Sequence, residues 1–198
     1  STYLAIRFAL ESFPPYLQMS SRFLVAGLGL AVWMRFVRRA SWPDARQWRN
    51  ALVVGALMLG GGMGQVAVAE QTVGSGIVVV FVAIVPLLIV LLNRLWGVRP
   101  KPLELAGIAV GLVGVLMLTR GAGFQASPRG LAAMATACSC WSLGSVLSQR
   151  SLPLAPGAMG FASEMLCGGV VLGLFALLAG EQFHWPPTPA AAWAWLYL

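Results

Sequence analysis

The sequence predicts an all-α integral membrane protein, a multi-pass bundle of helices. Of its 198 residues, 59% are hydrophobic and only 10% are charged. A soluble protein carries about 25% charged residues, so this chain has too few charges to cover a surface that faces water. Apolar runs such as GIVVVFVAIVPLLIVLL do not alternate with polar residues. The missing alternation excludes the strands of a membrane barrel and favours helices.

Gaps between charged residues locate the spans. Three stretches without any charge are long enough to cross a bilayer as helices. These are residues 50–69, 71–93 and 130–149. A fourth span is expected from Pro102 to Thr119, because proline suits the first turn of a helix and basic Arg120 follows.

Two further spans are expected at about 15–34 and 156–180. Each contains a single internal charge, Arg22 in the first and Glu164 in the second. The apolar segments at the two ends of the sequence are expected to belong to two more helices. The prediction is therefore six complete spans and two partial ones.

The distribution of Lys and Arg predicts the orientation, because cytoplasmic loops carry these residues in excess. Nine of them flank the even-numbered connections: Arg35, Arg38, Arg39, Arg46, Arg49, Arg94, Arg99, Lys101 and Arg150. The opposite side holds Arg120 and Arg129. We expect the nine to face the cytoplasm. The formal net charge of +7 then reflects basic loops, and no nucleic-acid partner is expected.

The sequence contains an internal repeat. Residues 21–27 (SRFLVAG) align without a gap on residues 163–169 (SEMLCGG), at an offset of 142 residues. One repeat then holds five spans, and an odd number forces the second copy to insert upside down, as in secondary transporters. We expect a first repeat at 1–122 with a truncated first helix, and a second at 123–198 truncated after its second helix. By this spacing a complete protein needs about 90 more residues.

Short motifs occur in order along the whole chain. They are Ser1-Thr2-Tyr3, Arg22-Phe23-Leu24, Glu70-Gln71, Pro86-Leu87, the glycine-rich stretch 107–118, and Trp141 with Ser145. In these motifs the chain resembles EamA-type permeases of the drug/metabolite transporter superfamily, most closely the YedA-like bacterial inner-membrane members. The resemblance implies ten helices around a central cavity. It also implies export of small metabolites, such as amino acids or related amphiphiles, without ATP.

Polar and kink-forming residues inside the apolar helices are candidates for lining that cavity and binding the substrate. They are Tyr3, Arg22, Gln65, Glu70, Pro86, Trp141, Ser145 and Glu164. Arg22 and Glu164 occupy the same repeat position with opposite charge. They either bind the two ends of a zwitterionic substrate, or each snorkels outward or pairs locally.

Three of these features have a second interpretation. Glu70 is either a solvated carboxylate at the membrane interface or a cavity residue. Pro86 kinks its helix, either for packing or beside a cavity. The glycines at 60–64, 107, 111, 169 and 173 are expected to let neighbouring helices approach closely. Those at 60–64 alternatively leave room for the substrate.

Enzyme and metal chemistry are not expected. The sequence has a single histidine and lacks a nucleophile–base motif, so we expect no enzyme activity, no cofactor and no metal site. Cys138, Cys140 and Cys167 are interpreted as small packing residues. The leading hypothesis is a secondary transporter of the inner membrane for a small organic metabolite. A non-transporting membrane scaffold or subunit is the alternative. The expected partners are the substrate and the lipid bilayer, and a homodimer is left open.

Overall fold

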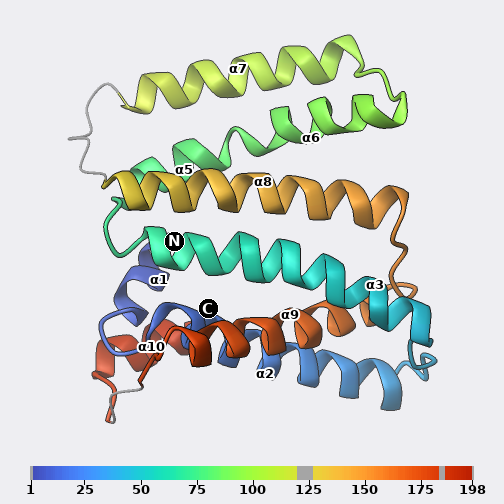
Figure 1. Ribbon diagram of the computed structural model, residues 1–198, viewed down its shortest axis with the longest axis vertical. Coiled ribbons are helices and arrows are strands. Elements are labelled where there is room, and N and C mark those ends of the chain that lie inside the picture. Colours follow the sequence, from blue (N-terminus) through green and yellow to red (C-terminus); the bar gives the residue numbers. More distant parts are fainter. Residues whose placement is uncertain (1, 120–126, 183–185, 198) are drawn as a thin grey trace.

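The computed structural model describes residues 2–119, 127–182 and 186–197, and in these ranges the chain is helical with no strand. The helices are α1 (Thr2–Ala9), α2 (Pro15–Phe36), α3 (Ala45–Gly55), α4 (Gln65–Ala69), α5 (Ser75–Val82), α6 (Val85–Asn93), α7 (Pro102–Thr119), α8 (Pro128–Arg150), α9 (Ala158–Leu178) and α10 (Pro189–Tyr197). A π-helix, η1 (Ala56–Gly64), joins α3 to α4, and a short 3₁₀ helix, η2 (Arg94–Trp96), follows α6. The long helices run side by side, with α7 at one edge and α2 and α9 at the other (Figure 1).

Among the described residues, five helical stretches are long and apolar enough to cross a membrane: Pro15–Phe36, Ala45–Ala69, Gly76–Trp96, Pro128–Arg150 and Ala158–Leu178. The predicted spans at these positions are confirmed as helices. α7 coincides with the predicted span 102–119, and its described apolar part, Pro102–Gly114, is shorter than the other five. The count of six complete spans remains a prediction.

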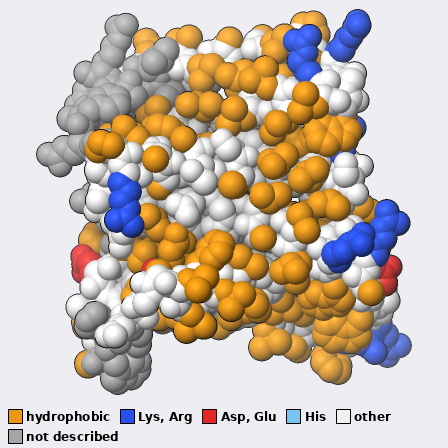
Figure 2. All heavy atoms as spheres, in the orientation of Figure 1, with side chains coloured by type: hydrophobic (Ala, Val, Ile, Leu, Met, Phe, Trp, Pro, Cys, Tyr) orange, Lys and Arg blue, Asp and Glu red, His pale blue; other side chains and the backbone are white. Residues whose placement is uncertain are grey.

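Basic side chains gather at one end of the bundle. The α2–α3 connection, the α6–α7 connection and the end of α8 all lie there (Figure 1). Figure 2 shows most of the visible Lys and Arg side chains at this end and apolar side chains over much of the face between the ends. We call it the arginine-rich end. Arg120, which was expected at the opposite end, lies outside the described residues.

The helix starts follow from local sequence. Pro15 and Pro128 occupy first turns, where the missing N–H has no helical partner to lose. α3 begins earlier than predicted because Asp44 caps it. The Asp44 side chain accepts from the Gln47 backbone N–H at 2.7 Å, and the Gln47 side chain accepts from the Asp44 N–H at 3.0 Å. The first two turns of α3 carry Arg46 and Arg49 at the arginine-rich end.

The predicted kink at Pro86 is a complete break. α5 ends at Val82 and α6 begins at Val85, with Ala83 and Ile84 in a turn between them. Proline has no backbone N–H, so the Val82 carbonyl cannot receive the bond that Pro86 would otherwise donate. Within one apolar span, the backbone therefore changes course near the middle.

The glycines of η1 pack against α8 and α9. A Cβ atom added to Gly61 would lie 2.8 Å from Cys140 Sγ, and one added to Gly62 would lie 3.1 Å from the Trp141 ring. The packing interpretation is confirmed here. For Gly107 and Gly111 it stays a prediction, because no described heavy atom outside their own helix lies within 4 Å of an added Cβ. α7 lies at one edge of the bundle (Figure 1).

α2 and α9 form a close antiparallel pair. Near the start of α2, Ser20 Oγ donates a hydrogen bond to the Gly169 carbonyl at 2.8 Å. Further along α2, a Cβ added to Gly27 would meet Met165 Cβ at 2.9 Å. The later residue of α2 thus contacts the earlier residue of α9. The segments that align as a repeat are the ones that pack together in space.

Candidate functional site: an apolar pocket beside the broken helix

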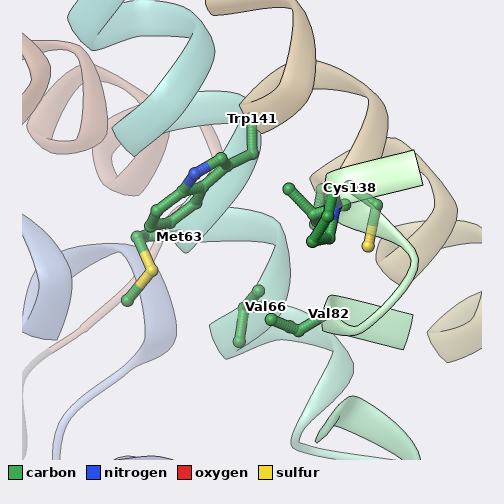
Figure 3. Close-up of a pocket in the computed structure, with 8 residues that line it drawn as sticks. Met63, Val66, Val82, Cys138 and Trp141 are labelled. Atoms are coloured by element: carbon green, nitrogen blue, oxygen red, sulfur yellow. The ribbon is translucent and has the colours of Figure 1, made fainter. Parts of the chain in front are cut away.

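A pocket of about 240 Å³ lies between η1, α4, α5, α6 and α8. Its lining residues are Met63, Val66, Val82, Val85, Pro86, Ala137, Cys138 and Trp141. Figure 3 shows Met63 beside the indole of Trp141, with Cys138 on the other side of the view and Val66 and Val82 below. We call this site the apolar pocket. It lies near the middle of α8 and of the broken span.

Each wall has a local cause. The helix break places Val82 and Pro86, from two different helices, at the same pocket. Helical spacing places Cys138 and Trp141 on one face of α8, because they are three residues apart. The Cys138 thiol donates to the Phe81 carbonyl at 3.3 Å, which ties α8 to the last turn of α5. The pocket is therefore built at the break itself.

Two of the eight predicted candidates, Pro86 and Trp141, line this pocket. Gln65 lies one residue from Val66 but is engaged elsewhere, because its Nε2 donates to the Tyr16 hydroxyl at 3.0 Å. Ser145 is partly buried one turn further along α8 and accepts from Gln149 Nε2 at 3.5 Å. The Tyr3 side chain lies outside the described residues.

Glu70 is 3% exposed at the end of α4. Its interpretation as a solvated carboxylate at the membrane interface is therefore wrong. Glu70 follows α4 directly, in a turn where the Val73 N–H donates to the Ala69 carbonyl at 2.8 Å, and Val73 is also buried. Neither residue lines the apolar pocket.

Arg22 and Glu164 do not line the pocket either. The Arg22 guanidinium lies 5.0 Å from the centroid of the Phe23 ring, and its Nη1 lies 3.9 Å from Met19 Sδ. Both contacts are local to α2. Glu164 is 7% exposed on α9, and its backbone carbonyl lies against Gly55 of α3, 2.7 Å from an added Cβ.

Sequence reasoning missed six lining residues: Met63, Val66, Val82, Val85, Ala137 and Cys138. Helical spacing from Pro86 and Trp141 was a usable signal for Val82 and Cys138, which share a helix face or a break with them. Met63 and Val66 gave no such signal. They reach the pocket because η1 and α4 pack against α8, which only the tertiary fold determines.

A second, polar hollow of about 480 Å³ lies at the end opposite the arginine-rich end. Among its lining residues are Glu11, Tyr16, Gln71, Arg129 and Glu181. Glu181 also holds the start of α2, because its carboxylate oxygens accept from the backbone N–H groups of Tyr16 and Leu17 at 3.1 and 2.8 Å. This carboxylate therefore has a structural partner already.

Comparison with known proteins finds similarity to membrane transporters. The EamA-like transporter family matches residues 1–120. The chain is 40% identical over 189 residues to the "Uncharacterized inner membrane transporter YedA" of Escherichia coli K12, an alignment that covers 95% of this chain and 61% of the relative. The proteins of the same name from E. coli O6:H1 and O157:H7 match to the same extent. The chain thus spans about three-fifths of the length of these relatives. No solved structure matches it. From the family match and this identity, the chain belongs to the EamA-like transporter family.

Proposed function

We propose that the chain is part of a secondary transporter of the bacterial inner membrane that exports a small organic metabolite by alternating access. The substrate is of the size and kind of an amino acid or an amphiphilic drug-like compound. The apolar pocket carries this proposal, because it lies between several helices beside a discontinuous helix, and substrate sites of secondary transporters are formed by discontinuous helices. The family and the name of the relatives support a transport role.

The contacts between α2 and α9 support the inverted repeat. In a two-fold arrangement, a contact between one residue of the first helix and one residue of the second occurs twice. The second contact joins their two repeat equivalents, each of which lies on the other helix. Gly27 lies against Leu166, and its repeat equivalent Gly169 lies against Leu24, the equivalent of Leu166. This reciprocity is what a pseudo-two-fold axis between α2 and α9 produces.

The test is transport in membrane vesicles that carry the protein, without ATP. A panel of radiolabelled metabolites is followed for uptake and efflux, and vesicles from cells without the protein serve as the control. We expect saturable movement of at least one compound. A panel that covers neutral, cationic, anionic and zwitterionic compounds and shows no movement above the control would contradict the proposal.

A further inference from the structure

The apolar pocket contains no charged side chain among its lining residues. The lining is aliphatic apart from the Cys138 thiol and the Trp141 indole. The Cys138 thiol already donates to the Phe81 carbonyl at 3.3 Å. Arg22 and Glu164, the two intramembrane charges for which zwitterion binding was one of two alternatives, lie elsewhere. A charged group that entered this pocket would lose its hydration and gain no ionic partner.

The size of the pocket sets the size of its occupant. A cavity of about 150 Å³ holds one benzene ring, and drug-sized ligands occupy about 300–1,000 Å³. The value of about 240 Å³ lies between the two. One ring with substituents, or two fused rings, fills this volume.

The helix break supplies one hydrogen-bond acceptor. Val82 lines the pocket, and its carbonyl lacks the donor that a regular helix would supply four residues later, because Pro86 has no N–H. In an apolar environment an unpaired carbonyl is costly, so a ligand with one O–H or N–H group gains by pairing with it. Neutral rings with a single donor, such as phenols and indoles, match this combination of apolar walls and one acceptor.

We infer that the apolar pocket binds an uncharged molecule, or the uncharged part of one, with one or two rings and a single hydrogen-bond donor. As a statement about the transported substrate, this rests on the proposed function. The statement that the pocket binds such a molecule does not depend on the proposed function. It selects neutral ring compounds over the amino-acid zwitterions that the Arg22 and Glu164 hypothesis favours.

Binding of radiolabelled indole to the purified protein in detergent tests this inference by equilibrium dialysis. Ala137→Phe fills the pocket from α8, and Ala135→Phe is the matched control, because Ala135 is on the exposed face of the same helix. We expect saturable binding to the wild type and to Ala135→Phe, and binding at least about tenfold weaker to Ala137→Phe. Val82→Phe fills the pocket from α5 and is the second variant if Ala137→Phe does not fold.

Competition identifies the chemical class. Phenol should displace labelled indole. Tryptamine, a cation, and indole-3-acetate, an anion, should each require at least about tenfold higher concentrations than unlabelled indole, because their charge finds no partner in the pocket. Heptane tests the competing idea that the pocket is a groove for lipid chains. Displacement by heptane as effective as that by phenol would overturn the inference.

Native cysteines localise the probe without relying on pocket-filling variants. One variant keeps only Cys138, which lines the pocket, and another keeps only Cys167, which does not. Indole should slow the reaction of N-ethylmaleimide with Cys138 and leave the reaction with Cys167 unchanged. Equal effects on both thiols would indicate partition into the micelle and would contradict a site in the pocket. If Cys138 does not react at all, the two phenylalanine variants decide.

The outcomes separate this inference from the proposed function. If the protein binds indole in the pocket but transports nothing, the binding inference stands and the proposed transport function is wrong. If the protein transports a metabolite but shows no saturable indole binding, the transport function stands and the binding inference is wrong.

Discussion

Gly27 and Gly169 make the same close contact with each other's helix. A Cβ added to Gly27 would lie 3.1 Å from the backbone nitrogen of Leu166, and one added to Gly169 would lie 3.2 Å from the backbone nitrogen of Leu24. Side-chain atoms lie closer still, Met165 Cβ at 2.9 Å from the Cβ added to Gly27 and Leu24 Cγ at 2.8 Å from the Cβ added to Gly169, so a larger residue at either position would crowd both the backbone and a side chain of the facing helix. The two helices of the predicted repeat therefore approach each other through equivalent residues.

Gly27→Ala should destabilise the protein. The new methyl group would meet Met165 Cβ at 2.9 Å as well as the Leu166 backbone, and overpacking of this kind costs about 1–3 kcal/mol. Gly29→Ala on the same helix is the control, because nothing lies within 4 Å of its added Cβ. Unfolding in mixed detergent micelles measures both variants. Equal stability of the two would show that α2 and α9 are not held this closely.

Glu181→Ala should loosen the start of α2. The Glu181 carboxylate accepts two hydrogen bonds from backbone N–H groups in the first turn of α2. Pro14, the residue before the helix, has no side-chain acceptor that could cap these groups. We expect a loss of about 1–2 kcal/mol in the free energy of unfolding. Glu181→Gln should lose less, because it keeps one acceptor. Glu11→Ala, at an exposed carboxylate of the same hollow, should change the stability little. A loss of the same size for Glu11→Ala would mean that net charge, not capping, stabilises this end.

The arginine-rich end should face the cytoplasm. In a variant whose native cysteines are replaced by serine, Arg99→Cys should be protected from a membrane-impermeant thiol reagent in intact cells, and Gln182→Cys should react. Both should react after the cells are opened. Reaction of Arg99→Cys in intact cells, with Gln182→Cys protected, would reverse the orientation.

Arg22→Gln and Glu164→Gln should leave indole binding within about twofold of the wild type, since neither residue lines the apolar pocket. Arg22 interacts with Met19 and Phe23 on its own helix, so its charge serves α2 locally. Dialysis with each variant, after its folding is checked, measures the effect. A tenfold loss of affinity in both variants would restore the hypothesis that these two charges hold the substrate.

Much of the fold could be predicted from where charges and prolines stand. The run from Pro102 to Thr119 is bounded by features of its own sequence, and α7 has those bounds. Pro86 predicts a kinked or broken helix because every proline lacks the backbone N–H, whatever its surroundings. Trp141 was a cavity candidate because its indole lies inside a predicted apolar span. These are local signals, and they held.

What the sequence could not predict depends on contacts between distant segments. The π-helical course of η1 accompanies the close packing of Gly61 and Gly62 against α8. Glu70 looked like an interfacial residue because it ends an apolar run, and its burial comes from the tertiary fold. Met63 lines the pocket because η1 packs against α8, and residue spacing in the sequence does not predict which helices pack together.

The most direct test of the account is transport by the Ala137→Phe and Ala135→Phe variants. Efflux of a neutral ring compound and of its charged analogues is measured from ATP-free vesicles that carry equal amounts of wild type or variant. The account predicts saturable efflux of the neutral compound by the wild type and by Ala135→Phe, and loss of that efflux in Ala137→Phe. Efflux by Ala137→Phe at the wild-type rate would contradict it, because the substrate would then cross the protein without entering the apolar pocket.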